Sequence, residues 1–286
     1  MTKMVEGPLI SELQALIDRE PVDEVLIALP QEKYNHLVET IVGLCEEQGI
    51  IVRVQTAMFN LKIARWQSDE LDGRPFVTIQ SGPSSRWDLI AKRLIDVCGS
   101  AVLLVGMAPI LAIVALLIKL DSPGPVFFSQ DRVGLNRRRF RLFKFRTMTD
   151  GADELQHRLE HLNEADGPVF KIRNDPRITR IGKFLRRFSI DELPQLFNVF
   201  KGDMSIVGPR PLPVRDVERI NARWHKRRFS MKPGVTCLWQ VNGRSDVSFD
   251  DWVVMDLEYI DKWSLALDLR ILLQTVPTVL KGSGAY

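Results

Sequence analysis

The sequence predicts a helix-rich, mixed α/β protein in three parts, and the patterns within those parts support the prediction. Residues 1–85 alternate strand-like and helix-like patterns, residues 86–122 contain one long apolar run, and residues 123–286 have the composition of a soluble domain. The 286 residues suffice for one large domain or two modest ones. Hydrophobic residues make up 45% of the chain and charged residues 26%, so the chain can bury a core.

The first part has the pattern of half an α/β domain. Residues 22–29 have the pattern of a buried strand, residues 31–48 carry apolar side chains at helical spacing, and residues 50–54 have the pattern of a second strand. This order favours a parallel βαβ unit. Residues 76–79 are a candidate third strand, and residues 82–85 have the composition of a linker.

The second part contains one candidate membrane segment. Residues 97–118 hold no charge over 22 positions, and a straight helix of that length covers about 33 Å, enough for a hydrocarbon core of about 30 Å. Pro109 removes a backbone hydrogen bond mid-run and favours a bend at Ala108 and Pro109. Basic residues flank both ends, at Lys92 and Lys119. Because basic flanks stay on the cytoplasmic side, they predict a re-entrant hairpin. The alternative is a buried core helix of a soluble protein.

The third part carries two basic clusters that predict an anionic ligand. Seven basic residues lie within positions 131–148 and seven more within 171–187, each set with one acid. Such clusters bind phosphate, nucleic acid or acidic lipid headgroups. For the three arginines at 137–139, which closely follow the apolar run, a solvated face or a lipid-headgroup contact is favoured.

Two adjacent carboxylates, Asp191 and Glu192, lie at an expected helix start. Pro194 fits a first helical turn, which makes Asp191 a candidate N-cap of a helix that ends at Gly202. One interpretation is therefore purely structural. The other is chemical, because the same location stabilises an ionised carboxylate and attracts phosphate.

The cations around this pair favour the chemical interpretation. Arg186 precedes the pair, and Arg210 follows it in a Gly-Pro-Arg-Pro turn. Lys144 and Arg146 flank a phenylalanine further upstream. Arginine forks match phosphate oxygens, and a divalent metal offsets the repulsion between a carboxylate and a diphosphate. We therefore expect phosphate binding by Lys144, Arg146, Arg186 and Arg210, and binding of Mg²⁺, with Mn²⁺ as the alternative, by Asp191 and Glu192.

Six sequence strings follow one another between residues 92 and 244. They are KRLIDV (92–97), SPGPVFF (122–128), FKFRTM (143–148), NDPRITRIGKFLRR (174–187), DELPQLFNVFKGDMSIVGPRP (191–211) and KPGVTCLWQVNGR (232–244). In this order they resemble the bacterial sugar transferases, which are monotopic polyprenyl-phosphate phosphoglycosyl transferases. The resemblance runs from about residue 87 to residue 286, although members often have Ser-Pro where this chain has Ala108-Pro109.

Residues 1–85 resemble the end of the Rossmann-like domain of larger members. Those members carry transmembrane helices ahead of that domain, so we expect a shortened natural form or an incomplete copy of that architecture.

The resemblance implies a two-step transfer of a sugar phosphate. Asp191 matches the family nucleophile, which attacks the β-phosphate of a uridine diphosphate (UDP) sugar and releases uridine monophosphate (UMP). Undecaprenyl phosphate then attacks the covalent adduct, in the first membrane step of exopolysaccharide, capsule, O-antigen or glycoconjugate synthesis. Glu192 matches the partner of the nucleophile, and Arg186 and Arg210 match phosphate-binding positions.

The resemblance also implies a place and a set of partners. The expected location is the bacterial inner membrane, with the catalytic domain facing the cytoplasm and membrane lipids as partners. A homodimer is compatible with the family, and no nucleic-acid partner is expected. Two alternatives stay open: a basic membrane-surface or nucleic-acid-binding protein, and a non-catalytic scaffold of a polysaccharide assembly complex. The basic clusters lack a nucleic-acid recognition motif, and the intact carboxylate pair argues against the scaffold.

Overall fold

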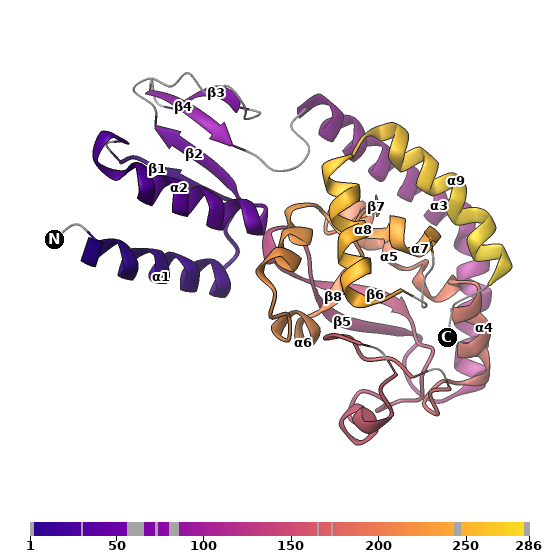
Figure 1. The fold of residues 1–286 in the computed structure, drawn as a ribbon. Helices are drawn as coiled ribbons and strands as arrows, with labels where there is room; N and C mark the ends of the chain where they lie inside the picture. Colours follow the sequence, from indigo (N-terminus) through magenta and orange to yellow (C-terminus); the bar gives the residue numbers. More distant parts are fainter. Residues whose placement is uncertain are drawn as a thin grey trace.

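The structure is a computed structural model, and the predicted linker at residues 82–85 lies outside its described part. That part contains two α/β units and one long helix, α3, which runs along the second unit (Figure 1). The described residues are 3–29, 31–55, 66–71, 74–79, 86–164, 166–172, 174–242 and 247–282.

The N-terminal unit is a four-stranded sheet with two helices. The sheet has the strand order β1-β2-β4-β3. Strands β1 and β2 are parallel and connected through α2, which confirms the predicted βαβ unit, whereas β4 is antiparallel to both β2 and β3. The elements are α1 (Lys3–Arg19), β1 (Glu24–Ile27), α2 (Gln31–Gln48), β2 (Ile51–Gln55), β3 (Trp66–Leu71) and β4 (Arg74–Ile79).

This sheet departs from the sequence predictions in two ways. The strand expected at residues 76–79 is present but antiparallel, so the Rossmann-like assignment is not confirmed. Strand β1 is also not the buried strand that we expected, because it lies at a sheet edge and leaves Leu26 49% exposed. The core of the unit instead forms around α2 and β2, where Ile41, Cys45 and Val52 are buried.

Helix α3 (Arg86–Asp121) contains the apolar run and has an exposed apolar face. It is long and apolar enough to cross a membrane, and only 11% of its most apolar window is buried. A buried core helix, the alternative considered from the sequence, is therefore excluded. The helix continues through Ala108 and Pro109, so the backbone has no interruption at the predicted bend, and the re-entrant path is not confirmed. A proline removes one hydrogen bond, and the neighbouring turns of a long helix can tolerate that loss.

The second unit consists of short strands enclosed by helices. Strands β6, β5 and β8 form an antiparallel sheet in that order, and β7 pairs with β9 in parallel. Its strands are β5 (Phe127–Val133), β6 (Arg139–Phe145), β7 (Ser205–Val207), β8 (Leu212–Pro213) and β9 (Gly234–Thr236). Its α-helices are α4 (Arg180–Arg187), α5 (Gln195–Lys201), α6 (Val214–Glu218), α7 (Leu238–Asn242), α8 (Phe249–Asp261) and α9 (Leu265–Lys281).

The N-terminal third of α3 is fixed to the second unit by buried polar contacts. Lys92 donates to the carboxylate of Asp268 at 2.5 Å and to a carbonyl of β7 at 3.0 Å. Arg93 donates to two carbonyls of α5 at 2.7 and 2.9 Å. Asp96 accepts from the hydroxyl of Ser205 and from the next backbone N–H. These residues therefore hold the second unit against the start of the helix.

The C-terminal end of α3 contacts the same unit. Ile118 is buried in a cluster with Phe145 and Leu185, from β6 and α4. Asp121 accepts a hydrogen bond from the backbone N–H of Ile181 at 3.1 Å, at the start of α4. Both ends of α3 are thus attached to one folded unit, and Figure 1 shows the helix passing behind α9 and reaching α4.

Arg137 and Arg138 connect the two units, which corrects the expectation of a solvated or lipid-facing cluster. Arg137 donates to the carbonyls of Ile17 and Asp18 at 2.6 and 2.8 Å. Arg138 forms an ion pair with Asp23. For these two arginines the expectation was wrong, because the N-terminal unit offers them carboxylates and helix-end carbonyls, whereas the side chain of Arg139 is 68% exposed, as expected of a solvated face.

Candidate active site

The local backbone places Asp191 in a tight turn ahead of α5. Ser189 has a φ of 54°, in the left-handed region, and a 3-10 helix follows over Ile190–Glu192. Helix α5 begins at Gln195, and Pro194 occupies its N-cap position without a side-chain cap bond. Asp191 is therefore not the N-cap, and the structural interpretation was wrong on this point. The predicted end of the helix at Gly202 is confirmed.

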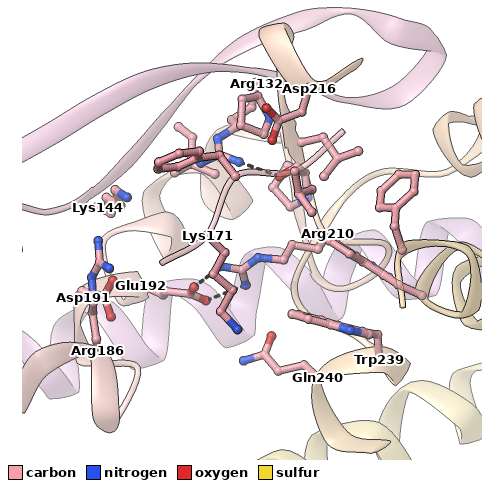
Figure 2. A pocket seen from close by; sticks show the side chains of 18 of the residues that line it. Arg132, Lys144, Lys171, Arg186, Asp191, Glu192, Arg210, Asp216, Trp239 and Gln240 are labelled. Carbon is pink, nitrogen blue, oxygen red and sulfur yellow. Dashed lines mark hydrogen bonds and ion pairs between the residues drawn. The ribbon is translucent and has the colours of Figure 1, made fainter. Parts of the chain in front are cut away.

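The strand-and-helix framework lines an open cavity of about 680 Å³ at this turn. This volume lies within the range of about 300–1,000 Å³ that is typical of small-molecule sites. Figure 2 shows how side chains from β6, α4 and the 3-10 helix converge there with Arg210. The structure thus brings together five predicted site residues: Lys144, Arg186, Asp191, Glu192 and Arg210.

Arg146, the sixth predicted residue, does not line this cavity. It is only 5% exposed, and its guanidinium donates to the carbonyls of Pro123 and Ser122 at 2.6 and 2.7 Å. A Cβ at Gly124 would lie 1.9 Å from this guanidinium, so the turn after α3 closes tightly on it. Arg146 therefore fixes that turn to the end of β6, and its placement does not support the predicted phosphate contact.

Glu192 and Arg210 form a fork-to-fork ion pair (Figure 2). Both guanidinium NH₂ groups of Arg210 reach the carboxylate, one of them at 3.3 Å. Burial opposes ionisation of Glu192, but the charge and hydrogen bonds of Arg210 outweigh it and hold its pKa below the usual range. Glu192 is therefore favoured as an anion, and its two hydrogen bonds orient Arg210.

The carboxylate of Asp191, unlike that of Glu192, has no hydrogen-bond partner among the described residues. Asp191 is 8% exposed, and no group in the described part of the chain donates a hydrogen bond to its carboxylate. Burial raises the pKa of Asp191 to about 6, with a further contribution from the charge of Glu192 and an opposing one from Lys144 and Arg186. The pair thus holds one fixed carboxylate and one with free oxygens in a cationic cavity.

Lys144 and Arg186 supply positive charge beside Asp191. Burial lowers the pKa of Lys144 to about 8, and the nearby charge of Arg186 adds to the effect. Arg186 is held in place because its Nε donates to the hydroxyl of Thr147 at 3.0 Å. Helix α4 lies close against the end of β6, since a Cβ at Gly182 would come within 2.1 Å of the Thr147 carbonyl oxygen.

Sequence reasoning missed several residues that line the cavity. Arg132 donates to the carbonyl of Pro211 at 3.0 Å and so fixes the loop that carries Arg210. The sequence could have indicated both Arg132 and Trp239, because Arg132 belongs to a basic cluster and Trp239 belongs to one of the strings that carry the family resemblance. The missed lining residues include Arg132, Phe170, Lys171, Asp216, Trp239, Gln240 and Trp252.

The site fits a metal ion only in combination with a phosphate ligand. No group of three or more His, Cys, Asp or Glu side chains that could hold a metal occurs among the residues that the structure describes. Mg²⁺ is commonly bound by one or two carboxylates together with substrate phosphates. Asp191 has free oxygens for such a role, whereas both oxygens of Glu192 face Arg210. The donor set therefore fits Mg²⁺ that is completed by a diphosphate.

The raised pKa of Asp191 predicts an acid limb in the pH profile of any reaction that uses it as a nucleophile. Below pH of about 6 the carboxyl group is protonated and cannot attack, so kcat/KM should rise with pH through about 6. Glu192→Gln should move this limb to lower pH, because the charge of Glu192 raises the pKa of Asp191. Initial rates between pH 4.5 and 8 measure both effects, and a wild-type profile that stays flat down to pH 5 would contradict this assignment.

A buried carboxylate with free oxygens among several cations is a site for chemistry on phosphate groups. The comparisons with known proteins agree with this class. Residues 87–282 match the family described as "Bacterial sugar transferase". The chain belongs to this family, which confirms the resemblance seen in the sequence.

Three curated relatives illustrate the similarity. The "Galactosyl transferase CpsE" of Streptococcus agalactiae is 40% identical over 280 residues, which cover 97% of this chain and 61% of that protein. The "Undecaprenyl-phosphate glucose phosphotransferase" of Komagataeibacter xylinus is 36% identical, with coverage of 97% and 52%. The "Exopolysaccharide production protein ExoY" of Rhizobium meliloti is 39% identical, with coverage of 69% and 88%. The chain spans only about half to three-fifths of the length of the first two relatives.

Proposed function

We propose that this protein transfers a sugar-1-phosphate from a UDP-sugar to undecaprenyl phosphate, through a covalent aspartyl-phosphate on Asp191. The observation that carries the proposal is the Asp191 carboxylate, which is buried among cations and accepts no hydrogen bond from the described residues. Relatives named as an undecaprenyl-phosphate glucose phosphotransferase and an undecaprenyl-phosphate galactose phosphotransferase support the substrate class.

The chemistry proceeds in two displacements at one phosphorus atom. In the first, an oxygen of Asp191 bonds to the β-phosphorus of the donor, and the bond from that phosphorus to the UMP oxygen breaks. In the second, an oxygen of undecaprenyl phosphate bonds to the same phosphorus, and the bond to Asp191 breaks and restores the carboxylate. Arg210, held by Glu192, together with Lys144 and Arg186, stabilises the charge on the phosphoryl oxygens.

Release of UMP tests this function directly. Purified protein in nanodiscs with undecaprenyl phosphate is given a panel of UDP-sugars with glucose, galactose or acetylated amino sugars, and UMP is measured. At least one donor should give sustained UMP release and a polyprenyl diphosphate sugar when the lipid acceptor is present, and at most about one UMP per protein molecule without it. A protein that releases no UMP from any donor would favour the non-catalytic scaffold.

A divalent metal belongs to the same proposal. Asp191 would hold Mg²⁺ against the donor diphosphate, Glu192 would join it only on leaving Arg210, and the ion would supply charge neutralisation there. We expect excess chelator to abolish UMP release and added Mg²⁺ to restore it, with Mn²⁺ as a weaker or equal substitute. UMP release measured at fixed ionic strength checks this, and full activity in excess chelator would rule out the metal requirement.

We also propose that α3 enters and leaves the membrane on one face, with the second unit on the cytoplasmic side of the inner membrane. The support is that both ends of α3, at Lys92 and at Asp121, bond to the same folded unit. A straight crossing would place those ends on opposite sides of a hydrocarbon core of about 30 Å. In this arrangement residues 1–85, 86–122 and 123–286 act as an N-terminal unit, a membrane segment and a catalytic domain.

Cysteine labelling tests this topology. The exposed Cys98 is first replaced by serine. Asp88→Cys or Pro125→Cys is then introduced, one at a time, just outside the two ends of the apolar run. Both should resist a membrane-impermeant thiol reagent in intact cells and react after the membrane is opened. A reaction of either position in intact cells would indicate a complete crossing. The buried thiols of Cys45 and Cys237 remain as an internal background control.

A further inference from the structure

We propose that Trp239 and Gln240 bind the uracil ring of the donor, Trp239 by stacking and Gln240 by pairing with the N3–H edge. This inference rests on the proposed function, because it assigns the nucleotide end of the same cavity. Both residues belong to the short helix α7 and line the cavity. Figure 2 shows them on one side of Arg210, with Asp191, Lys144 and Arg186 on the other.

The first observation is a buried amide that lacks a partner. Gln240 is 7% exposed, and its Oε1 accepts no hydrogen bond from the described part of the protein. An unpaired buried acceptor is unfavourable, so a ligand that supplies a donor at this point gains affinity. Uracil presents an N3–H donor beside the O4 acceptor, and a primary amide presents the complementary acceptor and donor.

The second observation is an aromatic surface that is already held in place. Trp239 stacks on Trp252 with ring centroids 4.5 Å apart and an angle of 18° between the planes. The guanidinium of Arg228 lies 5.0 Å from the centre of the Trp252 ring and supports the stack further. Trp239 is half-buried and its Nε1–H is buried without a partner among the described residues. A base that stacks on a fixed ring loses little conformational freedom, and such stacking contributes about 5- to 150-fold in affinity.

The third observation is the position of the phosphate-binding groups. The guanidinium of Arg210 lies 5.9 Å from the centre of the Trp239 ring and is paired with Glu192, the neighbour of Asp191. A nucleotide whose base stacks on Trp239 therefore directs its diphosphate towards Arg210. From there the β-phosphate is the part of the donor that extends towards Asp191, as the proposed first displacement requires.

Nucleotide binding provides a test that does not depend on turnover. Isothermal titration of the protein in nanodiscs compares UMP with N3-methyl-UMP, whose methyl group replaces the N3–H donor. The wild type should bind UMP about 10- to 100-fold more tightly than the methylated nucleotide. Gln240→Ala should weaken UMP binding by about tenfold and bring the two nucleotides to equal affinity. Trp239→Leu should lower the affinity for both nucleotides by the same factor, and this factor should be larger than for Trp239→Phe.

Gln48→Ala is the matched control. Gln48 is also a buried glutamine, 5% exposed, with an amide that has no partner among the described residues, but it lies in α2 and outside the cavity. This variant should bind UMP with the wild-type affinity and should keep the wild-type preference for UMP over N3-methyl-UMP. If Gln240→Ala does not fold, Gln240→Met keeps the side-chain volume without the amide and carries the same expectation.

The outcomes separate this inference from the proposed function. Equal wild-type affinity for the two nucleotides, or an unchanged preference in the Gln240 variants, overturns the uracil site, even when UMP is released normally from a UDP-sugar. Absence of both UMP binding and UMP release with every donor overturns the proposed function, and the uracil site with it.

Discussion

Asp191→Asn is expected to lower the rate of UMP release by at least about 10³-fold, because it removes the ionised nucleophile and keeps the side-chain size. The structure makes this substitution a clean test. Asp191 caps no helix, and its carboxylate accepts no hydrogen bond from the described residues, so asparagine removes no structural contact. Thermal unfolding of the variant should therefore match the wild type within about 1 kcal/mol.

Covalent labelling identifies the step that is lost. With donor labelled in the β-phosphate and no lipid acceptor, the wild type should retain label on the protein, and Asp191→Asn should retain none. Glu192→Gln is the companion variant, because it releases Arg210 but leaves the nucleophile. It should slow transfer and still accept label. Substantial turnover by Asp191→Asn would exclude the covalent route and leave direct attack by the lipid phosphate.

The sequence predicted the site better than it predicted the contacts of its arginines. Three of the site residues, Arg186, Asp191 and Glu192, lie within seven positions, so local reasoning brought them together. Arg210 was found because it lies in a Gly-Pro-Arg-Pro turn. Arg146 illustrates the limit. Its spacing from Lys144 suggested a shared role, but Arg146 lies just after the end of β6 and binds the turn at Ser122 instead, a contact that the sequence does not indicate.

Long-range pairing explains the other differences. Arg137 and Arg138 pair with the N-terminal unit, whose docking surface is formed by residues more than 100 positions away. The βαβ unit was predictable because its apolar periods are local, whereas the antiparallel arrangement of β4 depends on strand β3, whose sequence is too polar to indicate a strand. The apolar run predicted the exposure of α3, but the helix is 36 residues long and continues through Pro109 rather than ending at the predicted bend.

A buried ion pair holds the loop that carries Arg210, and its loss should strongly destabilise the protein. Arg228 and Asp256 are each 1% exposed and form an ion pair at 2.5 Å. The same guanidinium donates to the carbonyl of Arg210 at 2.9 Å. Replacing Arg228 with methionine leaves the carboxylate of Asp256 buried without its partner. The free energy of unfolding should therefore fall by about 3–5 kcal/mol.

The destabilisation by Arg228→Met should depend on pH because of Asp256. Burial raises the pKa of this carboxyl group to about 6, although the charge of Arg228 lowers it. Without Arg228 the pKa in the folded state rises further above the unfolded value of about 3.9. A raised folded pKa contributes stability that is present at low pH and lost as pH increases. The loss of unfolding free energy in Arg228→Met relative to the wild type should therefore be small at pH 5, where Asp256 is protonated in the variant and in the wild type. At pH 8 this loss should be full.

Two further variants make this result decisive. Arg227 is the neighbouring arginine and pairs with Asp261 in a more exposed position, so Arg227→Met should cost less than about 1 kcal/mol. The double variant Arg228→Met/Asp256→Leu removes both buried charges and should recover most of the stability. Its UMP release should stay low, because the carbonyl of Arg210 still lacks its donor and the loop that presents this arginine to phosphate is no longer fixed. Thermal and urea unfolding in nanodiscs at pH 5 and 8, beside UMP release, measure these effects. Equal unfolding free energies for the Arg228 and Arg227 variants at pH 8 would show that the buried pair does not hold the site together.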